Sequence, residues 1–248
     1  MQLLGDVLSP PRCVACELAV RRAHVFCPAC AATVERCGAA DADIASDGVA
    51  FAYYGGALAT AIRRLKYEDR PYLARPLGQL LRAACRAAEL DVSAVLPVPL
   101  HPHRLVERGY NQAALLAAHV AREIGVPLVT TALVRPVDTA PQAKLSGAAR
   151  QANLVTAIEV TGRAAVKDQV LAVVDDVSTT GATLGACGRA LLAAGARRVV
   201  GVVLARTASS AQRIAPGLDA GAVLDIGDSQ VQVSSRCANV PLRANLRN

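Results

Sequence analysis

Apolar residues after Asp91 alternate between short continuous runs and stretches with helical spacing. The continuous runs predict strands over residues 94–98, 126–134, 170–174 and 198–205. The helical spacing predicts helices over residues 112–124 and 183–194. Because buried runs that alternate with helices are typical of a parallel sheet covered on both faces, the pattern predicts an α/β fold with a parallel sheet flanked by helices.

The rest of the chain indicates how the domains are organised. A strand is expected over residues 49–54, and helical spacing follows at Leu58, Ile62, Leu65, Leu73, Leu77, Leu80 and Leu81. We expect a cysteine-rich module at 1–40, a linker at 41–50, the main domain at 51–215 and a C-terminal tail of unassigned role at 216–248. Residues 135–153 have no clear period, and so long an irregular segment in a compact domain is usually functional or disordered.

Composition excludes several classes of protein. With 248 residues, 53% of them hydrophobic and 19% charged, the chain can bury a sizeable core, which excludes a disordered protein. No apolar run approaches the roughly 18 residues that indicate a membrane span. The first residues contain no basic stretch followed by an apolar one, so no secretory signal is expected. We therefore expect a cytoplasmic protein that does not insert into a membrane.

The strongest chemical signal follows the run at 170–174, where two adjacent carboxylates, Asp175 and Asp176, precede a hydroxyl-rich turn. The turn and the helix start contain Ser178, Thr179, Thr180, Gly181, Ala182 and Thr183. Backbone N–H groups of such a turn can bind a phosphate, and a glycine lets the backbone approach it closely. Carboxylates at the carboxyl end of a parallel strand suit sugar hydroxyls and a divalent cation. The alternative is an ordinary strand-to-helix connection, which needs one capping hydroxyl and no acidic pair.

The sequence of residues 170–183 resembles the signature of type I phosphoribosyltransferases, which bind 5-phosphoribosyl 1-pyrophosphate (PRPP) together with Mg²⁺. The resemblance implies the fold of that family. It also implies that Asp175 and Asp176 hold the ribose hydroxyls during catalysis and that residues 178–183 cradle the 5′-phosphate. Transfer from PRPP passes through a sugar cation while pyrophosphate leaves, so the protein must position and neutralise charge, and we expect no Ser/His/Asp triad.

Other residues are candidates for holding the pyrophosphate. They are Pro97, Val98, Pro99, Arg104, Arg108 and Lys66. The prolines fix the backbone of a loop that in phosphoribosyltransferases holds pyrophosphate. Lys144 and Arg150 lie in the irregular segment and are interpreted as catalytic, because a cationic loop can close over the pyrophosphate and stabilise it as it leaves. The alternatives are solvated bases on exposed loops and, for Lys66, a favourable charge at a helix end.

Four segments look like motifs of the ComF family and occur in the expected order, at residues 65–67, 97–100, 108–112 and 142–153. With the cysteines, the resemblance extends from Cys13 to about Arg206. ComF-like proteins are linked with DNA uptake in naturally competent bacteria. The resemblance therefore implies a fold and a PRPP site, and it adds DNA as a candidate partner.

Four cysteines near the N-terminus form two CxxC pairs. They are Cys13, Cys16, Cys27 and Cys30. Two such pairs predict a structural zinc site, and a segment too short for a core of its own gains its fold from the metal. His24 or Cys37 could replace one ligand, and a redox CxxC or inert thiols are the alternative. ComF relatives often have more cysteines here, so this chain carries a shortened zinc ribbon.

The net charge of +7 leaves more than one function open. Residues 51–215 contain 20 basic and 11 acidic residues, and such an excess suits a highly anionic sugar phosphate as well as nucleic acid. The first hypothesis is a Mg²⁺-dependent phosphoribosyltransferase with an unidentified acceptor. The second is an accessory protein of DNA uptake or repair that contacts single-stranded DNA or the uptake machinery, and the third is salvage of a nucleobase. The oligomeric state is left open.

Overall fold

Four parallel strands form the central sheet of the computed structural model, which describes residues 11–37, 48–135 and 158–208. The strand order is β1 (Gly48–Tyr53), β6 (Arg198–Arg206), β5 (Val170–Ser178) and β2 (Ala94–Pro97). β6 and β5 are the inner strands, and β5 pairs with β6 on one side and β2 on the other. Next to β2, Leu128 forms a parallel bridge with Val95.

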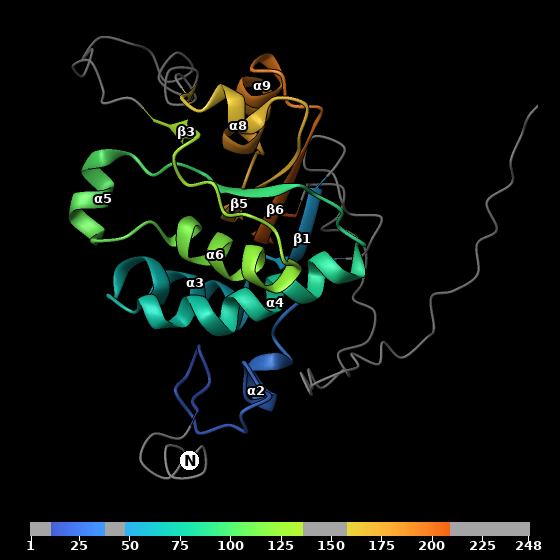
Figure 1. The fold of residues 1–248 in the computed structure, drawn as a ribbon. Helices are drawn as coiled ribbons and strands as arrows, with labels where there is room; N and C mark the ends of the chain where they lie inside the picture. Colours follow the sequence, from blue (N-terminus) through green and yellow to red (C-terminus); the bar gives the residue numbers. More distant parts are fainter. Residues whose placement is uncertain (1–10, 38–47, 136–157, 209–248) are drawn as a thin grey trace, which may run out of the picture.

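Helices cover both faces of this sheet (Figure 1). One face carries α3 (Gly56–Tyr67), α4 (Ala74–Ala87) and α6 (Gln112–Ile124), and the other carries α8 (Arg163–Val166) and α9 (Ala182–Ala193). Side chains alternate along β5, so Ala172 and Val174 belong to the core on the first face, whereas Leu171 and Val173 belong to the core on the α9 face. The face toward which each residue of β5 points is therefore fixed by its position in the strand.

Shorter elements complete the described part of the chain. They are α2 (Pro28–Ala31), the 3₁₀ helix η2 (Pro71–Leu73), α5 (Pro102–Arg108) and the antiparallel pair β3 (Leu133–Val134) and β4 (Glu159–Val160). Residues 11–37, which we call the cysteine module, lie against the α3 side of the main fold (Figure 1). Val14 and Phe26 of this module are buried in the same hydrophobic core as Leu58 and Leu65 of α3.

The sequence predicted the parallel sheet and its principal helices, and the structure confirms both. The helix expected over residues 112–124 has those bounds, and the strand expected over 49–54 is β1. Two expectations need correction. The strand at 170–174 continues to Ser178, because its pairing with β6 continues as far as Arg206. The strand expected over 126–134 is a single bridge at Leu128 followed by the two-residue β3, because β3 pairs with β4 and not with the central sheet.

Several sequence-based expectations fall outside the described residues. They concern Lys144, Arg150, the tail at 216–248 and residues 41–47 of the expected linker. Residues 48–50 of that linker range form the start of β1. Within the ranges that the structure describes, no helix combines the length and the apolar character that crossing a membrane requires.

Candidate functional site

Asp175 and Asp176 lie in the last part of β5, and they point to opposite faces of the sheet. Asp176 lies two residues after Val174 and therefore on the same face of the sheet, toward α3. Its side chain is 2% exposed. Asp175 follows Val173 toward α9 and is partly exposed. Each carboxylate also accepts a hydrogen bond from the next backbone N–H, at 2.8 Å. The two side chains therefore leave the strand on opposite faces, yet they remain close enough for a side-chain contact with Asp176 to raise the pKa of Asp175.

Lys66 is brought to this strand end by α3. Its Nζ lies 2.8 Å from Oδ2 of Asp176, and its side chain is 20% exposed. Lys66 is the penultimate residue of α3, whose apolar positions Leu58, Ile62 and Leu65 are fully buried against the sheet. Because that packing fixes the rotation of the helix, Lys66 is held over the carboxylate that faces α3.

Asp175 is in a different electrostatic environment. Burial raises the pKa of Asp175 well above its usual value, and the neighbouring charge of Asp176 raises it further. On the same face, burial and then the charge of Asp175 raise the pKa of Cys187 to about 12, whereas Arg135 lowers it. The cation of Arg135, which follows β3, thus lies on the Asp175 side, and it was not among the residues singled out from the sequence.

The turn after β5 leads directly into α9. Ser178 is buried at the strand end, whereas Thr179, Thr180 and Thr183 are exposed. The turn is held to the end of β6 by Thr207, whose hydroxyl donates to the Thr179 carbonyl at 2.8 Å. Gly181, the residue before α9, has φ +73°, a left-handed conformation that side chains disfavour, and a Cβ there would meet no heavy atom of the described residues within 4 Å. The glycine is thus needed for its backbone angle, and the space beside it is open.

The loop that begins with Pro97 is fixed beside the end of β5. The backbone N–H of Val98 donates to the Val174 carbonyl at 2.9 Å, immediately before the acidic pair. The Val98 carbonyl accepts from the amide of Asn111 at 3.0 Å. Asn111 also caps α6, because its Oδ1 accepts from the backbone N–H of Ala113 at 2.9 Å. One asparagine therefore ties this loop to the start of a helix.

The residues around Asn111 complete this connection. Gly109 ends α5 with φ +77°, and the Tyr110 hydroxyl donates to the Leu65 carbonyl, next to Lys66. Arg108 donates to Gln112 and lies 5.3 Å from the centre of the Tyr67 ring. The motif at 108–112 thus joins the Pro97 loop to the end of α3. The positioning roles of Tyr110 and Asn111 were not predicted, although an asparagine before a helical stretch is a recognisable capping signal.

Arg104 is placed differently from the other predicted residues. It lies on the outer side of α5, 62% exposed, and its guanidinium pairs with Glu107 of the same helix at 3.1 Å. None of the contacts found in the described ranges links Arg104 to the acidic pair. The structure therefore gathers Asp175, Asp176, Lys66, the turn and the Pro97 loop, and it leaves Arg104 at the edge.

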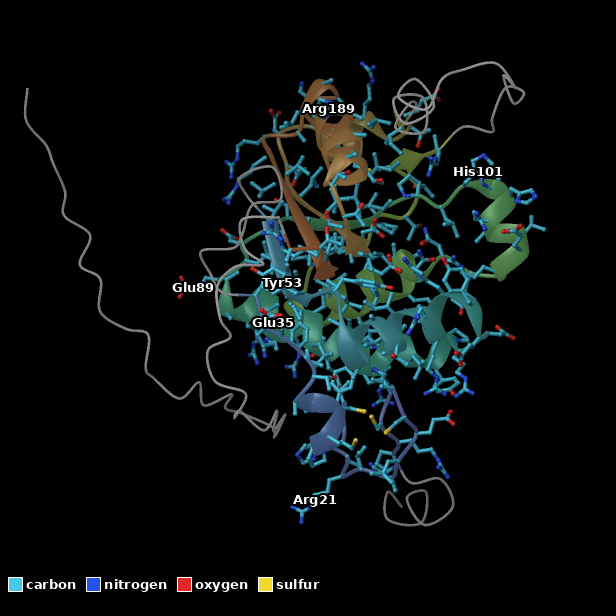
Figure 2. All side chains as sticks on the ribbon, turned by 180° about the vertical axis from the view of Figure 1, so that it is seen from behind. Arg21, Glu35, Tyr53, Glu89, His101 and Arg189 are labelled. Atoms are coloured by element: carbon cyan, nitrogen blue, oxygen red, sulfur yellow. The ribbon has the colours of Figure 1, made fainter. Side chains whose placement is uncertain are left out.

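The four cysteines of the two CxxC pairs form a second candidate site. The Sγ atoms of Cys13, Cys16, Cys27 and Cys30 all lie within 4.8 Å of one another. Those of Cys16 and Cys27 are 3.6 Å apart, close to the spacing of about 3.8 Å that a tetrahedral ion with metal–sulfur bonds of about 2.3 Å requires. Neither His24 nor Cys37 belongs to this described cluster. Figure 2 shows sulfur atoms gathered in the module beside α2.

The backbone of the cysteine module favours a thiolate at one of these positions. Burial opposes ionisation of Cys13, but the backbone N–H groups of Cys16 and Cys27 outweigh it and lower the pKa of Cys13 to about 7. Because metals bind the thiolate, the backbone around Cys13 suits a metal ligand, whereas burial and the neighbouring cysteines raise the pKa of Cys30.

The cysteine module is fastened to both ends of α3. At the helix start, the backbone N–H of Ala57 donates to the Thr33 hydroxyl at 2.9 Å, and a Cβ on Gly56 would lie 2.2 Å from the Thr33 carbonyl oxygen. Near the helix end, the buried Arg64 donates to the carbonyls of Val14 and Ala15 at 3.1 Å each. The helix that carries Lys66 is therefore anchored by the cysteine module.

Comparison with known proteins agrees with this arrangement. The phosphoribosyl transferase domain family matches residues 111–219, which include the acidic pair and the turn. Competence protein F of Haemophilus influenzae is 32% identical over 160 residues, which are 61% of this chain and 69% of the relative. DNA utilization protein YhgH of Escherichia coli K12 is 33% identical over 164 residues, which are 64% of this chain and 71% of the relative.

Among solved structures, the allosteric regulatory enzyme of purine biosynthesis is similar with a TM-score of 0.38 and 18% identity. That match covers 53% of this chain and 26% of the other, and its TM-score is too low to support an inference. The family match and the parallel sheet flanked by helices together show the type I phosphoribosyltransferase fold, which here accompanies a four-cysteine cluster suited to a metal ion. By its identity to these relatives over more than two thirds of their length, the chain belongs to the ComF family.

Proposed function

We propose that this protein binds PRPP at the carboxyl end of β5 and transfers its phosphoribosyl group to an acceptor that remains to be identified. The observation that carries the proposal is the placement of Asp175 and Asp176 between the Lys66 cation and the open Gly181 turn. This is the arrangement that a ligand with a ribose, a phosphate and a pyrophosphate requires, since α/β sheets bind ligands at the carboxyl ends of their strands.

In this proposal each part of the site has one task. Residues 178–183 bind the 5′-phosphate through the exposed hydroxyls of Thr179 and Thr180 and the N–H groups at the start of α9. The first of these N–H groups, that of Ala182, donates to the Thr180 hydroxyl at 3.4 Å. Asp175 and Asp176 accept hydrogen bonds from the ribose hydroxyls. The loop at 97–99, fixed by Asn111, together with Arg108 and Lys66, faces the pyrophosphate. Lys144 and Arg150 are proposed to neutralise the leaving pyrophosphate.

The Mg²⁺ that accompanies PRPP takes oxygen ligands, and the partly exposed carboxylate of Asp175 has the donor chemistry for it. The metal supplies positive charge to the departing pyrophosphate. The side chains themselves orient the ribose and neutralise charge, and neither task needs an activated nucleophile.

Calorimetric titration with PRPP and Mg²⁺ tests this proposal. The wild-type protein is expected to bind, and the double variant Asp175→Asn, Asp176→Asn is expected to lose binding. Asp91→Asn is the matched control, because Asp91 is exposed before the opposite end of β2. No binding at millimolar PRPP, or unchanged binding in the double variant, would contradict the proposal. A screen of nucleobases for pyrophosphate release then seeks the acceptor.

We further propose that the four-cysteine cluster holds a structural zinc ion. Cys₄ sets at this spacing are characteristic of zinc, and a short segment with few buried residues needs the metal to fold. Cysteines arranged as a metal site rather than as disulfides also fit a reducing compartment, so we propose the cytoplasm as the place of action.

A second candidate function is contact with DNA during uptake or processing. The relatives are called a competence protein and a DNA utilization protein, which supports DNA as a partner of this chain. In that case the PRPP site serves as a sensor or the domain as a scaffold. Loss of PRPP binding without loss of DNA binding, or the reverse, distinguishes the two functions.

A further inference from the structure

A solvent-open groove of about 570 Å³ lies between the cysteine module and the helices α3 and α4. Its walls carry five arginines and one tyrosine, namely Arg12, Arg22, Arg64, Arg70, Arg75 and Tyr72. We call this feature the arginine groove. None of the described residues proposed above to contact PRPP lines it, so it is a second location at which an anion can be bound.

The arginine groove is strongly positive. Among the described residues that line it, Glu17 is the one acidic side chain. Glu68, outside the lining, pairs with Arg64 at 3.1 Å and with Arg70 at 3.4 Å. Even when both carboxylates are counted against the arginines, an excess of three positive charges remains. A concave surface with such an excess attracts anions, because its walls concentrate the electric field.

The arginines of the groove divide into two groups. Arg64 is buried, and both Arg64 and Arg70 form ion pairs with Glu17 of the cysteine module. These two arginines therefore hold the module in place. Arg12, Arg22 and Arg75 are exposed, and they come from both walls, the first two from the module and the third from α4. Arg12 also donates to the Glu17 carbonyl at 3.1 Å. The guanidinium groups of these exposed arginines can therefore reach a ligand that lies along the groove, and a planar guanidinium binds phosphate oxygens in pairs.

Tyr72 adds a different kind of surface. It is 63% exposed on η2, and its hydroxyl accepts from Arg70 at 3.2 Å, which fixes the ring beside the cations. A small-molecule pocket is usually enclosed and lined mainly by apolar side chains, whereas this groove is open and cationic. A positive groove with an exposed aromatic ring is the arrangement that binds single-stranded nucleic acids, whose backbone follows the charges while a base stacks on the ring.

We propose that the arginine groove binds the phosphate backbone of a single-stranded nucleic acid, with a base stacked on Tyr72. The proposal rests on the second candidate function and assigns it a surface distinct from the PRPP site. Arg64 of the groove wall and Lys66 at Asp176 belong to the same helix, so a strand bound in the groove contacts the element that also carries the PRPP-site cation.

The test uses the full-length, metal-loaded protein and a fluorescently labelled oligothymidylate, followed by anisotropy across a salt series. The double variant Arg22→Gln, Arg75→Gln changes one exposed cation on each wall. It is expected to weaken binding and to reduce the slope of log K against log salt by about 1.4, since each lost phosphate contact of a single strand contributes about 0.7. Arg189→Gln is the matched control, because Arg189 is exposed on α9 at the other end of the molecule from the cysteine module (Figure 2).

Substitutions of Tyr72 test the stacking part separately. Tyr72→Ala is expected to weaken oligothymidylate binding by about tenfold, whereas Tyr72→Phe retains the ring and the affinity. PRPP titration of every variant verifies that the fold and the first site are intact.

The outcomes separate the two proposals. If the wild-type protein binds no oligothymidylate, the DNA function and the groove both fail, while the PRPP function is judged by its own titration. If wild type binds and the arginine variants keep its affinity and salt slope, the groove assignment alone is wrong. If thymidine monophosphate binds as tightly as the oligonucleotide, the groove takes a small anion, and the strand proposal is overturned.

Discussion

Lys66 Nζ lies 2.8 Å from Oδ2 of Asp176, and this ion pair joins the helix anchored by the cysteine module to the strand that carries the candidate PRPP site. Thr33 caps the start of that helix, and the Tyr110 hydroxyl binds the Leu65 carbonyl near its end. The cysteine module, α3 and the acidic pair are thus parts of one connected structure. The predictions below test its links one at a time.

Removing the cation of the ion pair is expected to destabilise the protein. In Lys66→Ala, the carboxylate of Asp176, which is 2% exposed, loses its compensating charge, and the free energy of unfolding should fall by about 3 kcal/mol. Adding Asp176→Asn to that variant should restore much of the loss, because the buried charge is then gone. Denaturant unfolding measures both. Lys167→Ala is the control, because Lys167 is exposed. If the control lost as much free energy of unfolding as Lys66→Ala, a specific role for the ion pair would be contradicted.

Asp175→Asn is expected to stabilise the ligand-free protein while it abolishes PRPP binding. The pKa of Asp175 is raised in the folded state by burial and by Asp176, so the fold favours the protonated form. Its contribution to stability is therefore present below the ordinary aspartate pKa of about 3.9 and is lost as pH rises through the raised value. Asparagine stays neutral and avoids that loss.

Thermal unfolding across a pH series checks this prediction. Above the raised pKa, the midpoint of Asp175→Asn should exceed that of wild type, and the difference should vanish in acid. PRPP binding by wild type should show the opposite dependence, strengthening as pH rises, because the ribose hydroxyls and Mg²⁺ need the carboxylate. If Asp175→Asn were less stable than wild type at neutral pH, the ionised carboxylate of Asp175 would not be lowering the stability of the ligand-free protein.

Zinc analysis tests the cysteine cluster. We expect one zinc ion per chain in wild type, retained in Cys37→Ser and lost in Cys16→Ser, because the four-cysteine set includes Cys16 and not Cys37. Loss of zinc should also weaken PRPP binding, since Thr33 and the module carbonyls bound by Arg64 hold α3 in place. To measure this coupling, zinc is removed with a zinc-selective chelator, Mg²⁺ is added back, and PRPP binding is then measured by calorimetry. Full PRPP affinity in the zinc-free protein would rule it out.

Asn111 is expected to position the Pro97 loop as well as cap α6. Asn111→Ala should cost about 1 kcal/mol of stability through the lost cap, and it should weaken PRPP binding because the Val98 carbonyl loses its donor. Asn111→Asp keeps the capping oxygen but replaces the amide donor with a negatively charged acceptor beside the Val98 carbonyl, so it should keep the cap of α6 and still bind PRPP weakly. If the aspartate variant bound PRPP as well as wild type, the contact with Val98 would have no positioning role.

Much of the fold followed from local sequence pattern. The buried run at 170–174 and the helical spacing at 112–124 correspond to a central strand and to α6, because hydrophobic periodicity reports burial directly. The strand was predicted too short, since three of the residues 175–178 are polar and this stretch is kept extended by pairing with β6. Pairing between distant strands leaves no local signal.

The sequence by itself determined the chemistry of this protein. It placed an acidic pair before a hydroxyl-rich turn, four cysteines at metal-binding spacing and a lysine after an apolar helix face. The spacing could not say that Lys66 pairs with Asp176, or that five arginines from the cysteine module and from the segment that runs from α3 to α4 share one groove. Those facts depend on how α3 packs between the cysteine module and the sheet. Only the tertiary structure decides that packing, because it brings together side chains that are far apart in the chain.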